Sequence, residues 1–139
     1  MKNHRADDED LIRALLDYLN HCHDGSLRRI SFVKNRELTE NGNLVLFSSE
    51  TLHKGDCDIE AELFLNSYIG ASPTQVVILN FQDVRSFRFY QDNDFDYSDI
   101  YEVSFCRVDK YTFEFSFRAT QQKIEALTVV CRKLVCREL

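Results

Sequence analysis

Residues 57–65 read CDIEAELFL, an almost strict alternation of apolar and acidic side chains. Successive side chains of a β-strand point to opposite faces of the sheet, so one face of this segment is apolar and the other carries carboxylates. The apolar face consists of Cys57, Ile59, Ala61, Leu63 and Leu65. This pattern predicts a half-buried strand of an antiparallel sheet with an acidic outer surface.

Strand-like patterns continue on both sides of this segment. Asn41-Gly42 is a typical hairpin turn, and Asp109-Lys110 separates two further alternating runs. The run 75–81 is continuously apolar, which predicts a strand that is covered on both faces. The segments with strand patterns are 27–33, 44–47, 75–81, 84–89, 100–108 and 111–117.

The last patterned segment, 124–135, is compatible with either a helix or a strand. Its apolar residues share a helical stripe, but Thr128, Val129 and Val130 are β-branched and lose side-chain freedom in a helix. We therefore expect a strand here.

An amphipathic helix is predicted for residues 7–21, where apolar side chains recur at three- and four-residue steps. The acidic residues 7–10 can cap its first turn, and Gly25 is expected to end it. The sequence thus predicts one domain over 1–139, with a β-rich body at 26–136. Its class is α+β, mainly β: an N-terminal helix followed by a seven- or eight-stranded antiparallel sheet or a two-sheet sandwich.

Composition places the chain among folded, acidic proteins. Hydrophobic residues make up 44% of the sequence, which includes eleven Phe, six Tyr and a single Pro. The net charge of −6 disfavours binding to nucleic acid or to an anionic membrane and favours a basic protein partner. No apolar run approaches the roughly 20 residues that span a bilayer. Five cysteines without the spacing of a disulfide framework, and charged residues directly after Met1, predict a cytoplasmic protein.

The most unusual segment is 92–102, in which carboxylates alternate with aromatic residues and no Lys or Arg occurs. An EF-hand is excluded because Tyr97 stands where the loop needs Gly and Val103 where it needs Glu. A loop solvated by its charges and a looser cation site remain alternatives. We favour a protein-binding surface, because aromatic anchors beside carboxylates suit a basic partner. The predicted partner-binding residues are Asp92, Asp94, Phe95, Asp96, Tyr97, Asp99, Tyr101 and Glu102.

A metal site is the alternative prediction, using His21, His23, His53 and Cys57 as imidazole and thiolate ligands. Zinc needs four such groups in tetrahedral positions, whereas these short spacings supply two at most. The competing interpretation is structural: His21 and Cys22 close the helix, and His23 forms its polar exit. On balance we predict no metal and no other cofactor.

No catalytic motif is present in the sequence. Glu60 and Glu62 share a strand face but have no acid, base or nucleophile beside them, and the four glycines are too scattered to cradle a phosphate. Cys131 and Cys136 are expected in the core, although neighbouring basic residues could lower a thiol pKa. We therefore predict that the protein is not an enzyme.

Three short patterns carry a resemblance to a known class. They are His23-Asp24-Gly25-Ser26-Leu27, Asp56-Cys57-Asp58-Ile59-Glu60, and the run 76–81 followed by Asp83-Val84. In outline the chain resembles small bacterial immunity-type proteins of polymorphic or contact-dependent toxin systems, in which a His-Asp-x-x-Leu motif precedes a β-rich domain. The resemblance implies a non-enzymatic protein that binds and blocks one cognate toxin. Separately, we expect a monomer or a homodimer, the latter through an exposed strand edge. No inhibitory residue can be carried over by position.

Overall fold

The computed structural model describes residues 2–34, 40–42, 57–65, 74–90, 99–119 and 124–139. The chain begins with strand β1 (Lys2–Ala6), helix α1 (Glu9–Tyr18) and a short 3-10 helix η1 (Asn20–Cys22). The strands that follow are β2 (Gly25–Lys34), β3 (Cys57–Leu65), β4 (Gln75–Gln82), β5 (Ser86–Phe89), β6 (Asp99–Arg107), β7 (Phe113–Ala119), β8 (Glu125–Cys131) and β9 (Lys133–Glu138). The predicted strand at 44–47 lies outside the described residues.

All nine strands of the described ranges belong to one antiparallel sheet, in the order β1-β9-β4-β3-β2-β6-β7-β8-β5. The prediction of a mainly-β fold with an N-terminal helix is therefore confirmed. Of the two predicted arrangements, the single antiparallel sheet is confirmed and the two-sheet sandwich is wrong, as is the predicted number of seven or eight strands. Two differences account for the count: β1 precedes the helix, and the predicted strand 124–135 is divided at Arg132 into β8 and β9.

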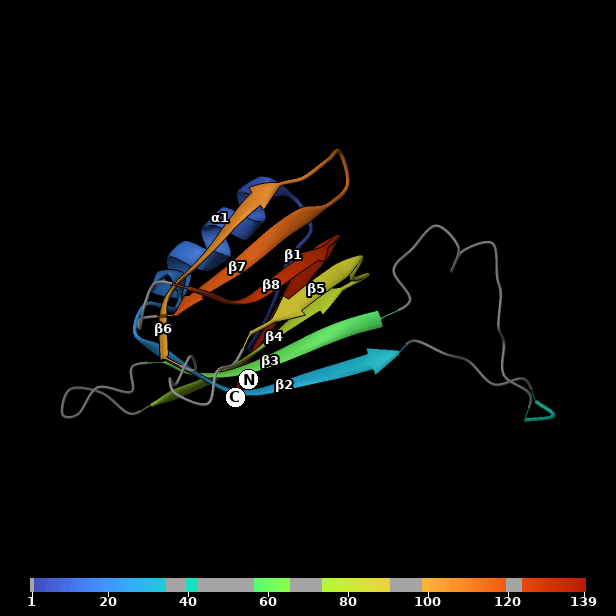
Figure 1. Ribbon diagram of the computed structural model, residues 1–139, viewed down its shortest axis with the longest axis horizontal. Coiled ribbons are helices and arrows are strands. Elements are labelled where there is room, and N and C mark those ends of the chain that lie inside the picture. The colour runs from blue at the N-terminus through green and yellow to red at the C-terminus, as the bar shows by residue number, and fades with distance from the viewer. Residues whose placement is uncertain (1, 35–39, 43–56, 66–73, 91–98, 120–123) are drawn as a thin grey trace.

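A single sheet encloses a core here because it folds over on itself (Figure 1). Strands β4 and β5 follow one another directly, as do β8 and β9, and β4 pairs with β9 while β5 pairs with β8. Hydrogen bonds from Arg85 N to Val130 O (2.7 Å) and from Arg132 N to Gln82 O (3.1 Å) continue the pairing across both bends. The ring of Phe81 on β4 consequently packs against Phe115 and Phe117 on β7, with centroids 5.1 and 5.8 Å apart.

The alternation of residues 57–65 is retained in strand β3. All five apolar residues of β3 are buried and the residues between them are partly exposed, as predicted. Strand β4 differs from its prediction, because Val77, Leu79 and Phe81 are buried whereas Val76 and Ile78 are only half-buried on the other face. Its outer face is therefore not covered like that of a parallel sheet.

Helix α1 begins where the acidic residues predict. Asp8 caps it, with Oδ1 accepting a hydrogen bond from Leu11 N at 2.8 Å, and Ile12, Leu15 and Leu16 bury the apolar stripe. The helix ends at Tyr18, three residues earlier than predicted. Gly25 does not end the helix as expected. It allows a close approach between segments, because a Cβ there would lie 2.9 Å from both Cys22 O and a methyl group of Leu65. None of the helices in the described ranges is long and apolar enough to cross a membrane.

The end of β9 is tied to three other elements by the carboxylate of Glu138. Its oxygens accept hydrogen bonds from Tyr18 Oη (2.8 Å) and Gln75 Nε2 (2.7 Å) and lie 3.1 Å from His4 Nε2. These partners, His4 first, hold the pKa of Glu138 below its usual value. The hydrogen bond between Tyr18 and Glu138 also raises the pKa of Tyr18. We call these four residues the Glu138 cluster.

Candidate functional site

The predicted protein-binding surface is described only in part. Five of its eight residues lie outside the described ranges: Asp92, Asp94, Phe95, Asp96 and Tyr97. The other three, Asp99, Tyr101 and Glu102, form the start of β6. These three residues are the part of the predicted surface that has a defined place in the fold.

A β-bulge directs the side chains at the start of β6. Ile100 and Val103 are buried, and the pairing with β7 shifts by one residue between Ile100 and Glu102, which makes Tyr101 the extra residue. A bulge re-aims side chains at the place where it occurs. The Tyr101 ring is 40% exposed. Asp99 is also exposed, and Glu102 is half-buried.

The turn before β2 supports this exposed ring. Gly25 and Ser26 pair with Ile100 and Asp99, which brings the preceding residues beside Tyr101. The rings of His23 and Tyr101 meet edge to face with centroids 5.2 Å apart, and His23 Nδ1 lies 2.7 Å from Asp24 Oδ2. We call Asp24, Asp99, Tyr101 and Glu102 the acidic surface. Arg118 lies opposite Glu102 on β7 at its border.

The three described residues of the alternative metal site, His21, His23 and Cys57, do not converge. His21 Nε2 lies 2.9 Å from Asp17 Oδ1, and Cys57 is buried at the far end of β3 from the residues that pair with the start of β2. The length of β3, about 26 Å at 3.3 Å per residue, separates those two ends. Within the described ranges no three His, Cys, Asp or Glu side chains are grouped to hold a metal ion. His53 lies outside those ranges.

Burial suppresses the reactivity of the two C-terminal cysteines. Cys131 and Cys136 are fully buried, as predicted from the residues around them. Desolvation raises the pKa of the Cys131 thiol and raises that of Cys136 to about 12. The neighbouring Arg132, Lys133 and Arg137 therefore do not activate these thiols. Cys22 is likewise buried, and its pKa is raised to about 12 by the same cause.

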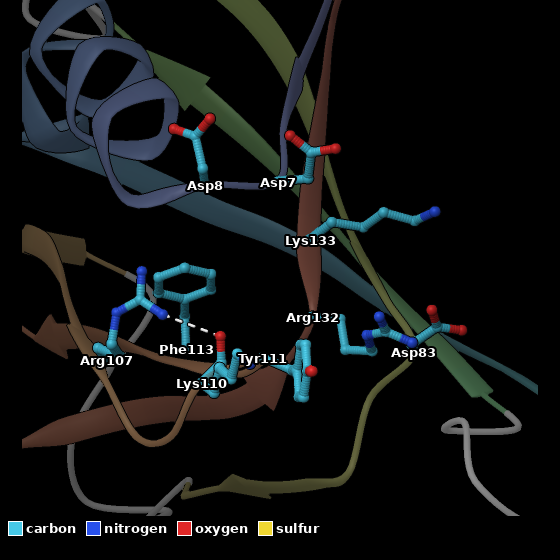
Figure 2. Close-up of a pocket in the computed structure, with 9 residues that line it drawn as sticks. All are labelled: Asp7, Asp8, Asp83, Arg107, Lys110, Tyr111, Phe113, Arg132 and Lys133. Carbon is cyan, nitrogen blue, oxygen red and sulfur yellow. Dashed lines mark hydrogen bonds between the residues drawn. The ribbon is translucent and has the colours of Figure 1, made fainter.

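A polar cavity that the sequence reasoning missed lies between the β6–β7 turn, the β1–α1 turn and the bends at Asp83 and Arg132 (Figure 2). Its volume is about 450 Å³. We call it the basic cavity, because it contains four cationic side chains, three carboxylates and two aromatic rings. Its lining residues are Arg107, Lys110, Arg132, Lys133, Asp7, Asp8, Asp83, Tyr111 and Phe113.

The floor of the basic cavity is a rigid turn. Asp109 Oδ1 accepts hydrogen bonds from Tyr111 N (2.8 Å) and Thr112 N (3.0 Å), which lower the pKa of Asp109. Arg107 Nη1 donates to Lys110 O at 2.9 Å, as drawn in Figure 2. These bonds fix the backbone from which Lys110 and Tyr111 project.

The Tyr111 ring organises two of the cations. Lys110 Nζ lies 5.4 Å and the Arg132 guanidinium carbon 5.8 Å from its centroid, both within the range of cation–π attraction. Figure 2 shows Asp7 and Asp8 across the cavity from Lys110 and Tyr111. The residues come from four separate parts of the chain, and the sequence indicated other roles for them. Asp7 and Asp8 were expected to cap the helix, Lys110 to form a turn, and the basic residues beside Cys131 to influence a thiol.

Comparison with protein-family models, with curated proteins and with solved structures found no match to this chain. The acidic surface and the basic cavity are therefore the two features of the chain that indicate a function.

Proposed function

We propose that this chain is a non-enzymatic, acidic binding protein of the immunity type, which neutralises a basic protein partner by masking the partner's functional surface. The observation that carries the proposal is the bulge at Tyr101, which leaves an aromatic ring exposed beside carboxylates. The same partner would contact the predicted residues of 92–97 that precede β6. Localisation in the cytoplasm is part of this proposal.

Tyr101 has the properties of an interface anchor. Tyr combines a large apolar ring with a polar hydroxyl, and aromatic residues are enriched among those that dominate binding energy. The His23 ring already restricts the Tyr101 ring from one side. Less side-chain entropy is therefore lost when a partner covers it.

The surrounding carboxylates would act mainly on the rate of association. The chain has a net charge of −6, and Asp24, Asp99 and Glu102 place part of that charge around the anchor. Charges at the rim of an interface steer an oppositely charged partner, and salt screens this attraction. Binding should therefore weaken as ionic strength rises.

The experiment begins with chemical cross-linking in the native cell, followed by purification of the full chain with its partner and identification of that partner. Calorimetry then measures the affinity of the purified pair, and a separate assay tests whether the partner's own activity is inhibited. Tyr101→Ala should weaken binding by about 2 kcal/mol or more. Asp99→Asn should mainly slow association.

Asp10→Asn is the matched control, because it removes one carboxylate from the exposed first turn of α1, at the other end of the helix. It should leave the association rate nearly unchanged. The proposal is overturned if no protein partner is recovered, or if binding is insensitive to salt and to both Tyr101→Ala and Asp99→Asn. A partner that binds through this surface but keeps its activity would remove the neutralising role alone.

A further inference from the structure

Three of the four cations of the basic cavity have no ion pair within the described chain, a property that they share with Arg29 and Arg118 but not with three other arginines. Arg13, Arg28 and Arg137 each have a carboxylate partner, with nitrogen-to-oxygen distances of 3.2, 3.6 and 3.7 Å to Glu9, Glu62 and Glu60. At the cavity, Arg107 is 3.7 Å from Glu9. By contrast, Lys110, Arg132 and Lys133 form no ion pair with any residue that the structure describes.

The three cations share the cavity with the carboxylates of Asp7, Asp8 and Asp83 but form no ion pair with them. Lys110 and Arg132 each lie within 6 Å of the Tyr111 ring centroid, and Figure 2 shows Lys133, the residue after Arg132, beside Asp7. The mutual repulsion of the three cations costs free energy, and water screens part of it at the exposed Lys110. A bound anion would remove that cost.

The number of cations favours phosphate over carboxylate. A phosphate monoester carries a charge of about −1.5 to −2 at pH 7 and three acceptor oxygens, whereas a carboxylate carries a single charge. The planar guanidinium of Arg132 can donate two parallel hydrogen bonds to such a group, and the lysines can add point charges.

The opposite wall specifies the rest of the ligand. Asp7 and Asp8 face the cavity, and only Oδ1 of Asp8 has a hydrogen bond within the described chain, as the cap of α1. Carboxylate oxygens accept hydrogen bonds from hydroxyl or amino groups. The volume of about 450 Å³ lies within the range for small-molecule sites and exceeds the space that inorganic phosphate needs.

We propose that the basic cavity binds a small, soluble phosphate ester that carries hydroxyl or amino groups. The phosphate lies against Lys110, Arg132 and Lys133, and the donors of the ligand face Asp7 and Asp8. This site is separate from the acidic surface, so the proposal does not depend on the function proposed above.

The test uses glycerol 3-phosphate as the probe and follows the full chain by two-dimensional amide NMR and calorimetry. Saturable binding with a Kd below about 1 mM is expected, with the largest signal changes at residues 109–112 and 132–133. Glycerol and inorganic phosphate, which each lack one half of the ligand, should bind at least tenfold more weakly. Asp7→Asn should weaken binding of the ester relative to that of inorganic phosphate, because it removes a charged acceptor for the ester and a charge that repels phosphate.

Lys110→Gln and Lys133→Gln should each weaken binding of glycerol 3-phosphate about tenfold or more, the loss expected for a charged hydrogen bond. Arg29→Gln is the matched control, since Arg29 is an exposed cation on β2 outside the cavity. Denaturation curves of the variants check that the fold is retained.

Binding that fails to saturate by about 10 mM, or that Arg29→Gln weakens as much as Lys133→Gln, would overturn the proposal. Equal affinity for inorganic phosphate would remove the role of the acidic wall. Sedimentation with phosphatidylglycerol vesicles that depends on Lys110, without binding of glycerol 3-phosphate, would assign the phosphate to a lipid headgroup and overturn the soluble ligand.

Discussion

The two ends of β9 carry opposite charges, and they differ in whether the charge has partners within the described chain. Glu138, the last residue of the strand, is bound by partners from β1, α1 and β4. Lys133, the first residue, lines the basic cavity and has no ion pair within the described chain. About 17 Å of strand separates them. The comparison distinguishes charge that the fold uses internally from charge that it leaves for a ligand.

The middle of β9 is where a substitution should reduce the free energy of unfolding most. Leu134 is fully buried and lies opposite Phe81 on β4. Leu134→Ala should lower the free energy of unfolding by about 2 to 5 kcal/mol, through lost burial and the cavity that remains. Urea denaturation of the wild type and the variant measures this difference in the free energy of unfolding.

Val135→Ala provides the control, because Val135 is only half-buried and points to the other face. Its loss should be clearly smaller. Equal losses for the two variants would show that β9 does not turn the Leu134 face into the core.

Glu138→Gln tests the satisfied end of the strand. It keeps the shape of the side chain but removes the charge that His4, Tyr18 and Gln75 surround, and should cost about 1 to 2 kcal/mol at pH 7. Because folding lowers the pKa of Glu138, its contribution is fully present above the unfolded pKa of about 4.3 and is lost as pH falls through the lower folded pKa.

The wild type and Glu138→Gln should therefore converge in stability at acidic pH when denaturation is repeated from pH 7 downward. Glu125→Gln is a suitable control, since Glu125 is exposed on β8 and accepts one long hydrogen bond, from Thr128 Oγ1 at 3.5 Å. A difference that persists unchanged to pH 3 would show that the charge of Glu138 is not what stabilises the cluster.

Sequence reasoning succeeded where side-chain pattern is local and failed where distant segments meet. The alternation at 57–65 predicted β3 because each side chain reports its own face. Strand β1, with only five residues, has no comparable pattern, and it is ordered by pairing with β9 more than 120 residues away. The sandwich was wrong because the bends at Asp83 and Arg132 let one sheet cover itself, and short sequence patterns do not encode such closure.

The candidate sites follow the same distinction. Asp99, Tyr101 and Glu102 were found because they lie within one acidic and aromatic segment, but the bulge that exposes Tyr101 depends on pairing with β7. The basic cavity was missed because residues 7, 83, 110 and 132 meet only in the folded chain. A sequence pattern identifies charges, whereas only the fold shows which of them have partners.

Lys133→Gln makes the smallest predicted change and tests the comparison most sharply. With no internal ion pair to lose, and with the length of the side chain retained, the free energy of unfolding in chloride buffer should change by less than about 0.5 kcal/mol. Glycerol 3-phosphate should then raise the Tm of the wild type more than that of the variant, because a ligand stabilises a protein in proportion to its affinity for the folded state. A loss above about 1 kcal/mol without ligand would show that Lys133 has an internal structural role, and the two ends of β9 would no longer differ in kind.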